Sequence, residues 1–176
     1  MVSSGSLHDE GITIVNQKLH KSAWPWLFLS LVIVLLDQLS KLAVVHHFNA
    51  YTQIELLPVL NLILRYNPGA AFSFLGNMGG WQVYLLGAFS LIVIVGLAVW
   101  LIKASRYQYF LVIGLSLIIG GAIGNLIDRV RLNMVIDFID FHIKTWHFAT
   151  FNIADSAICV GAALLIIHLL FSSRKC

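Results

Sequence analysis

The sequence predicts an all-α membrane protein whose chain crosses the bilayer four times. Of the 176 residues, 59% are hydrophobic and only 11% are charged, whereas about a quarter of the residues in soluble domains are charged. The mean hydropathy is +0.87. Four apolar runs are each long enough to cross a bilayer, which takes about 20 residues. These runs leave no room for a large soluble domain.

The apolar runs define the predicted domain organisation. Residues 1–22 are a polar N-terminal tail, expected to be cytoplasmic, whose first part has the Gly/Ser composition of an expression tag, and residues 23–176 form the membrane domain. The first run is longer than a signal-peptide core and lacks a small-residue cleavage site, which favours an uncleaved span. The predicted spans are 23–45, 81–102, 110–127 and 151–171.

The segments between the spans differ in character. Residues 46–80 alternate in polarity and contain two prolines followed by Gly and Asn, so we expect short strands at the membrane surface rather than a helix. Residues 103–109 predict a tight turn between the second and third spans. Residues 128–150 are a polar segment, rich in aromatic residues, that precedes the fourth span.

The charges indicate topology rather than a nucleic-acid partner. The 11 Lys and Arg residues give a net charge of +3 but form no basic run. Those at the termini and in the turn after the second span fall on one side, which the positive-inside rule makes cytoplasmic. They are Lys18, Lys21, Lys103, Arg106, Arg174 and Lys175. Most acids lie toward the opposite face, which agrees with this orientation.

The two cysteines form neither a disulfide framework nor a metal-ligand pattern. We interpret Cys159 as a small apolar filler of the last span. No His or Cys cluster and no phosphate-binding loop is evident, so the sequence predicts no metal, nucleotide or other cofactor.

Polar residues collect toward one end of the predicted bundle. Asp37 and Lys41, at positions i and i+4 of a helix, favour a structural ion pair near the interface, with Lys41 extending outward. Asn67 and Gly69 belong to a turn that is either a hairpin corner or a close approach of backbone to a ligand.

The third span ends in a second polar group. Gly120 and Gly124 have the small-xxx-small spacing that lets another helix pack closely. Asn125, Asp128 and Arg129 follow on the same helix. Here the sequence leaves two interpretations open, because these side chains can either brace a loop or contact a substrate or head group.

Asp137 and Asp155 are acids embedded among apolar neighbours. An ionisable group within a span costs roughly 2.5 to 3.5 kcal/mol on insertion scales. Two desolvated carboxyl groups in contact cannot easily both ionise, and a pair that shares one proton supplies an acid and a base, as in aspartic proteases. Asn152 lies one helical turn before Asp155 and could orient the pair or a substrate carbonyl. The spacing alone is equally consistent with two unrelated interfacial acids.

Five segments, in order, give the chain a resemblance to the bacterial lipoprotein signal peptidases, also called signal peptidase II. The segments are DQLSK, NPGAAFSF, GGAIGNLIDR, VIDFI and FNIADS, and the resemblance covers the chain from about Trp24 onward. It implies an intramembrane aspartic endopeptidase that cleaves a prolipoprotein just before its diacylglyceryl-modified cysteine, with Asp137 and Asp155 as the catalytic pair. It also implies substrate-binding or site-supporting roles for Asn67, Gly69, Asn125, Arg129, Asn152, Asp37, Lys41 and Asp128. Asp140 matches no catalytic position, and we interpret it as a surface acid.

The same resemblance implies the surroundings of the site. The fold would add a small extracytoplasmic β-cradle and a short extracytoplasmic helix or loop near residues 144–148. Both termini would be cytoplasmic, with the active site toward the outer face of the bacterial inner membrane. Expected partners are a prolipoprotein signal peptide carrying diacylglyceryl cysteine, membrane lipid and globomycin-type inhibitors, with no nucleic acid and no cofactor. The chain is expected to be a monomer.

A small proton-coupled transporter is the alternative from another class. Such proteins usually hold their intramembrane acids near the bilayer midplane, often between internal repeats. Here the acids cluster toward one end, and the two halves of the chain show no repeat. The sequence therefore favours the peptidase.

Overall fold

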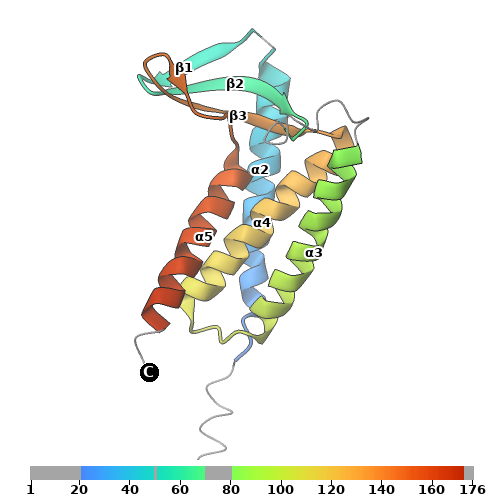
Figure 1. The fold of residues 1–176 in the computed structure, drawn as a ribbon, viewed down its shortest axis with the longest axis vertical. Helices are drawn as coiled ribbons and strands as arrows, with labels where there is room; N and C mark the ends of the chain where they lie inside the picture. Colours follow the sequence, from blue (N-terminus) through green and yellow to red (C-terminus); the bar gives the residue numbers. More distant parts are fainter. Residues whose placement is uncertain (1–20, 50, 70–80, 173–176) are drawn as a thin grey trace, which may run out of the picture.

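Four long helices and a small sheet make up the fold of the computed structural model, which describes residues 21–49, 51–69 and 81–172 (Figure 1). The helices are α2 (Leu27–His47), α3 (Trp81–Lys103), α4 (Tyr109–Leu132) and α5 (Ile153–Ser172), and a short 3-10 turn, η1 (Trp24–Trp26), precedes α2. All four are long and apolar enough to cross a membrane. The predicted four-span architecture is confirmed, and α4 continues past residue 127, where the third span was expected to end.

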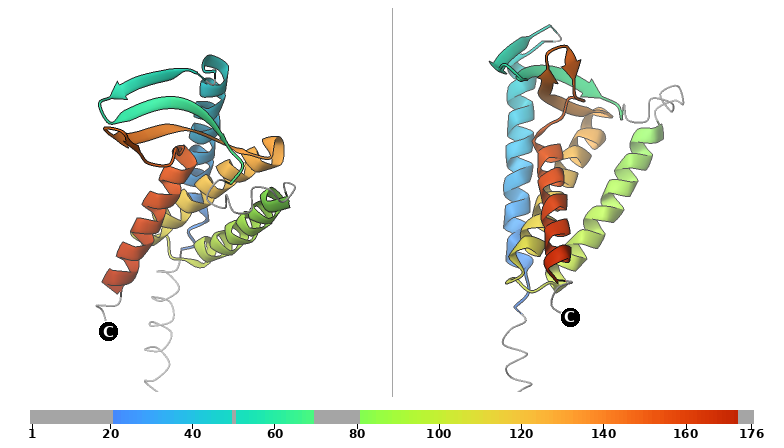
Figure 2. Two further views of the ribbon diagram at one scale, coloured as in Figure 1. Left: turned by 45° about the horizontal axis from the view of Figure 1, so that its top comes forward. Right: turned by 60° about the vertical axis from the view of Figure 1, so that its left-hand side comes forward.

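Helix α4 is the centre of the bundle and packs against each of the other three helices. Its glycines allow close contact with α2, since a Cβ added at Gly120 would lie 2.7 Å from the backbone oxygen of Ser30. One added at Gly124 would lie 2.5 Å from Asp37 Oδ2. The structure therefore supports the packing interpretation of both glycines. Helix α3 contacts α4 and diverges from α2 and α5 toward the sheet (Figure 2).

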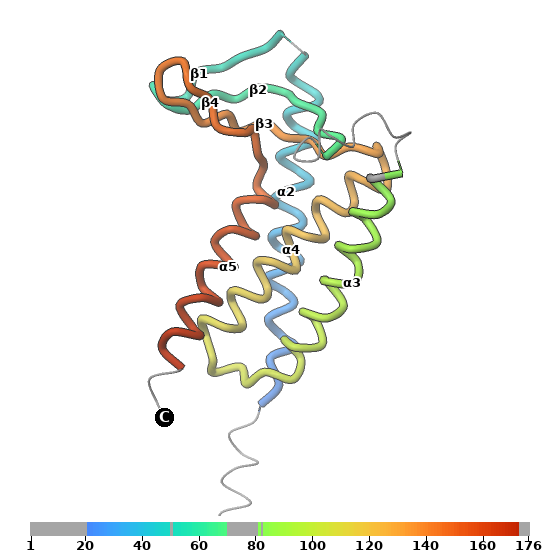
Figure 3. Tube along the Cα trace, viewed as in Figure 1, coloured from blue at the N-terminus to red at the C-terminus, as the bar shows by residue number. Residues whose placement is uncertain are grey.

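The sheet covers one end of the bundle (Figure 3). Its antiparallel strands follow the order β1 (Gln53–Leu57), β2 (Leu60–Asn67), β3 (Val135–Ile143) and β4 (Trp146–His147). The strands expected within residues 46–80 are present, although α2 extends to His47 and residues 70–80 lie outside the described part of the chain. Strand β3 was not predicted, because neither its polar residues nor its burial alternates with a period of two, and pairing with β2 forms the strand.

Residues 144–148 form a turn and the short strand β4, where the resemblance placed a short helix or a loop. Lys144 has φ +56°, a left-handed backbone that reverses the chain between β3 and β4. This tight reversal pairs His142 with His147 and leaves no helical turn at this position.

The opposite end of the bundle holds both ends of the described chain (Figure 1). Ser22 Oγ donates a hydrogen bond to the Ile102 carbonyl oxygen at 2.6 Å, and the Arg106 N–H donates to the Lys21 carbonyl at 3.0 Å. These bonds tie the start of the chain to the turn between α3 and α4. Cys159 is exposed on the outside of α5, so its interpretation as an interior filler is wrong.

Candidate active site

Asp155 lies in the first turn of α5, held there by a reciprocal cap. The Asp155 N–H donates to Asn152 Oδ1 at 2.9 Å, and the Asn152 N–H donates to Asp155 Oδ2 at 3.2 Å. This is the geometry of a capping box, in which the residue before the helix and the third helical residue satisfy each other's N–H groups. The local sequence thus starts the helix and places a carboxylate at its positive end.

Asp137 reaches the same place from strand β3. The N–H of Ile139 donates to the Phe151 carbonyl at 2.8 Å, and the N–H of Phe151 donates back to the Ile139 carbonyl at 3.0 Å. This bridge brings the next residue, Asn152, against β3, where its Nδ2 donates to Asp137 Oδ1 at 2.8 Å. Asn152 therefore hydrogen-bonds to Asp137 and to Asp155 at once, and the two acids are brought together.

Asn67 holds the other oxygen of Asp137. Its Nδ2 donates to Asp137 Oδ2 at 2.9 Å, while its Oδ1 accepts from the Gly69 N–H at 2.9 Å. Gly69 has φ +103°, which residues with a Cβ rarely adopt, and a Cβ there would lie 3.1 Å from Leu86 Cδ1. The turn is therefore more than a hairpin corner, because it orients the amide of Asn67 toward the carboxylate.

The surroundings of Asp137 raise the pKa of its carboxyl group above the usual range of an aspartate. Asp137 is 2% exposed. Its pKa is raised to about 6, mainly by burial and also by the nearby charge of Asp155, while the hydrogen bonds from Asn67 and Asn152 partly offset the rise. A carboxyl group with this pKa exchanges a proton near neutral pH, as general acid–base catalysis requires.

Asn125 connects Asp155 to α4. Its Nδ2 donates to Asp155 Oδ1 at 2.8 Å, and its Oδ1 accepts from Asn152 Nδ2 at 3.2 Å and from Lys41 Nζ at 3.1 Å. Arg129, one turn later, is half-buried and donates from its guanidinium to the Asn125 carbonyl at 3.3 Å. It also interacts electrostatically with Asp155. Arg129 is thus a cation beside the acids.

Beneath these residues Lys41 forms a buried ion cluster. Its Nζ lies 2.8 Å from Asp37 Oδ2 and 2.7 Å from Asp128 Oδ2. The ion pair with Asp37 is present, but Lys41 is only 1% exposed. The expectation that Lys41 extends outward is wrong, because two carboxylates on α2 and α4 compensate its charge inside the bundle.

The same carboxylates anchor the backbone of the two segments that carry the acids. Asp37 Oδ1 accepts from the Ala154 N–H at 3.0 Å, at the start of α5. Asp128 Oδ2 accepts from the Ile136 N–H at 3.2 Å, beside Asp137 on β3. The sequence left open whether Asp128 braces a loop or contacts a substrate, and this hydrogen bond supports the bracing role.

Gln38 is a supporting residue that the sequence analysis missed. Its Nε2 donates to Asp128 Oδ1 at 3.0 Å and to the Gly124 carbonyl at 3.1 Å. The position of Gln38 directly after Asp37 in the DQLSK segment was the sequence signal that could have identified it.

Asp140 is buried rather than a surface acid, which corrects its interpretation. It is 4% exposed and accepts from Asn61 Nδ2 at 3.0 Å and from His147 Nδ1 at 3.0 Å. Burial raises its pKa, but the hydrogen bonds from His147 and Asn61 outweigh burial and hold the pKa of Asp140 below its usual value. The sheet itself thus supplies the partners of Asp140, away from the candidate active site.

A cavity of about 440 Å³ separates α3 from α4 beside this site. Arg129 and Asn133 contribute to its lining, and the rest is largely apolar, including Tyr84 and Leu91. Among the described residues, no group of three or more His, Cys, Asp or Glu side chains could hold a metal ion. The polar chemistry of the described site is therefore that of carboxylates, amides and Arg129.

Comparisons with known proteins show which family this chain is similar to. The family described as signal peptidase (SPase) II matches residues 29–171. The lipoprotein signal peptidase of Coxiella burnetii is 56% identical over 155 residues, which cover 88% of this chain and 95% of that protein. That of Yersinia enterocolitica is 48% identical over 141 residues, 80% of this chain and 83% of that protein. A solved structure described as a bacterial membrane enzyme is similar with a TM-score of 0.76 at 33% identity, covering 86% of this chain and 97% of that one.

Proposed function

The chain belongs to the signal peptidase II family, and from this premise we propose that it is an intramembrane aspartic endopeptidase acting on prolipoproteins. It is a multi-pass membrane protein of a peptidase family. The proposed reaction is cleavage of the signal peptide just before the diacylglyceryl-modified cysteine. The observation that carries the aspartic mechanism is Asn152, whose hydrogen bonds join the Asp137 and Asp155 carboxyl groups.

In the proposed mechanism the two acids share one proton. The ionised carboxylate takes a proton from a water molecule, whose oxygen attacks the scissile carbonyl, while the protonated carboxyl gives its proton to the carbonyl oxygen. When the tetrahedral intermediate collapses, the C–N bond breaks and the leaving nitrogen receives a proton from the pair. The pKa of about 6 at Asp137 supports this assignment, because such a group is poised between its two forms near neutral pH.

The surrounding residues are proposed to hold the pair and the substrate. Asn67, Asn125 and Asn152 direct amide donors at the carboxyl oxygens. Gly69 permits the turn that aims Asn67, and Arg129 lies beside the acids at the cavity between α3 and α4. This largely apolar cavity suits the lipid-modified end of a signal peptide, and a globomycin-type inhibitor would compete for the same site.

The proposed orientation places the sheet outside. Lys103 and Arg106 lie at the opposite end of the bundle, together with both ends of the described chain, so the positive-inside rule makes that end cytoplasmic. The active site would then face the extracytoplasmic side of the bacterial inner membrane, where a prolipoprotein would be processed.

Cleavage of a diacylglyceryl-modified precursor by the purified protein tests this function. We expect the Asp137→Asn and Asp155→Asn variants to lose at least about a thousandfold in rate, because removing one member of a catalytic group disables the whole group. Asp140→Asn is the matched control, since Asp140 is also a buried acid of β3 but bonds only to the sheet. It should keep its rate. Wild-type cleavage by either catalytic variant would exclude the aspartyl pair, and proton flux without cleavage in vesicles would favour a transporter.

A further inference from the structure

A second cavity, of about 410 Å³, lies at the end of the bundle opposite the sheet. The end of α3, the turn into α4 and the end of α5 enclose it, and its polar lining comes from Lys103, Ser105, Gln108 and His168. It is separated from the candidate active site by the length of α4. The proposed peptidase reaction therefore gives this cavity no role.

The charge around this cavity is positive. None of the acids in the described part of the chain lies at this end, because they belong to the sheet, to the ion cluster beneath it or to the first turn of α5. Lys103 forms no ion pair among the described residues. The backbone of Arg106, in the adjoining turn, donates a hydrogen bond to the backbone of Lys21. These two residues therefore add two cations to the same end. Among the described residues, an anion would thus find complementary charge here and no competing carboxylate.

Helix α4 begins at the cavity and adds to the positive electrostatic potential there. Its first turn contains no acid, and its N-cap residue, Gln108, makes no side-chain capping bond. The Gln108 side chain instead accepts from the Ser105 N–H at 3.3 Å. The first N–H groups of a long helix carry partial positive charge, which adds to that of Lys103.

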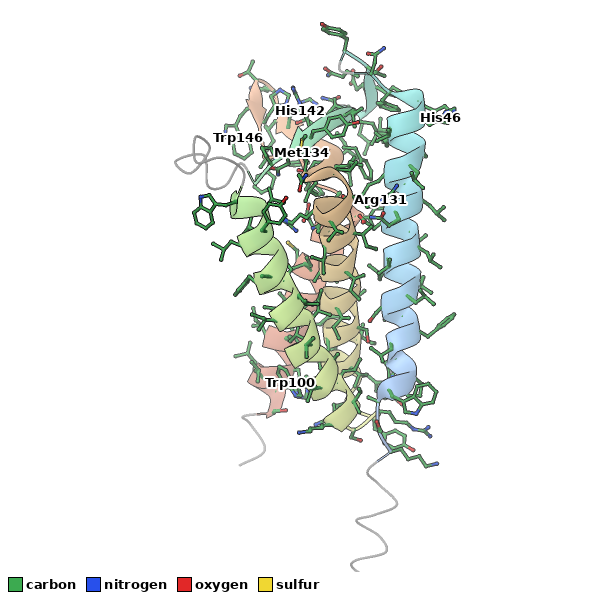
Figure 4. The ribbon with its side chains drawn as sticks, turned by 90° about the vertical axis from the view of Figure 1, so that its right-hand side faces the viewer. His46, Trp100, Arg131, Met134, His142 and Trp146 are labelled. Carbon is green, nitrogen blue, oxygen red and sulfur yellow. The ribbon has the colours of Figure 1, made fainter. Side chains whose placement is uncertain are left out.

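The depth of the cavity in the membrane follows from Trp100. This residue lines the cavity, is 43% exposed and lies near the end of α3 that faces away from the sheet (Figure 4). Tryptophan gathers at the level of lipid head groups, and basic pockets between spanning helices at this level suit anionic head groups. Lys103 follows one turn later, while Leu111 and Leu169 supply apolar lining.

We propose that this cavity binds the phosphate head group of an anionic phospholipid, with Lys103 and His168 as its side-chain contacts and the acyl chains running past Trp100. The proposal is independent of the peptidase reaction. It rests on the lined cavity, the positive charge of Lys103, which pairs with no described carboxylate, and the position at head-group depth.

Native mass spectrometry of the full chain tests the proposal. The protein would be released from micelles containing equal amounts of phosphatidylglycerol and phosphatidylcholine, and the retained lipid counted. A surface cation contributes about 1 kcal/mol toward anionic lipid, which corresponds to about fivefold in affinity. We expect Lys103→Gln to lower retained phosphatidylglycerol about fivefold and Lys103→Gln with His168→Gln to lower it further. Phosphatidylcholine retention should not change.

Lys144→Gln is the control, because it removes the same charge from an exposed turn at the other end of the molecule. Retention equal to wild type in the Lys103 variant, or an equal loss in the Lys144 variant, would overturn the proposal. Displacement of the lipid by millimolar inorganic phosphate would show a free-anion site instead of a lipid site and would also overturn it. Unchanged melting temperature and cleavage rate in the variants would support it, by separating lipid loss from misfolding.

Discussion

Replacing Asp137 with asparagine is expected to abolish a pH dependence of stability as well as cleavage. Burial and the neighbouring acid raise the pKa of Asp137 from 3.8 to about 6 in the folded protein. Between these two values the folded state holds a proton that the unfolded state has lost. The group therefore stabilises the fold fully below pH 3.8, and this contribution disappears as the pH rises through about 6.

The size of this change in unfolding free energy follows from the shift in the pKa of Asp137. A change of one pKa unit corresponds to about 1.4 kcal/mol, so the full shift is worth about 3 kcal/mol. Between about pH 4.5 and 7 the wild type should lose ~2 kcal/mol of unfolding free energy through Asp137, a change of about 4 to 8 °C in melting temperature. The Asp137→Asn variant should not show this loss. Equilibrium unfolding in detergent micelles at the two pH values measures the difference.

Asp140 offers a control of opposite sign. Its pKa is held below the usual value, so its contribution is present above the unfolded pKa and is lost only as the pH falls below it. Asp140→Asn should thus keep the wild-type difference between about pH 4.5 and 7. If Asp137→Asn shows the same pH dependence as wild type, the raised pKa and the proton-sharing pair built on it are refuted.

Three further perturbations follow from the site. Lys41→Met should lower the unfolding free energy by about 3 to 5 kcal/mol, because it leaves two buried carboxylates without their cation. Lys144→Met at the exposed turn is the control and should change the unfolding free energy by less than about 0.5 kcal/mol. Equal melting temperatures of the two variants would contradict this prediction. Gly69→Ala should slow cleavage and cost about 1 kcal/mol or more, since its φ of +103° positions Asn67; an unchanged rate would show that the turn is dispensable. Cleavage should continue at its full rate in excess metal chelator, and inhibition that added zinc reverses would point to metal chemistry instead.

Features that depend on local properties could be predicted from the amino-acid sequence. Span number follows from the length of apolar runs, and the fourth run predicted the helix that became α5. The resemblance singled out Asp137 and Asp155. The strands within residues 46–80 were also predictable, because their turn residues and alternation are local signals.

The contacts between distant segments became known from the three-dimensional fold. The sequence placed Lys41 at the membrane interface, but two carboxylates from different helices keep its charge inside the bundle. Asp140 was assigned to the surface, yet Asn61 and His147 reach it from neighbouring strands. Strand β3 became evident only through its pairing with β2. In each case the stabilising partner is remote in the chain, and the free energy of burying a charge or a strand depends on that partner, which no local pattern records.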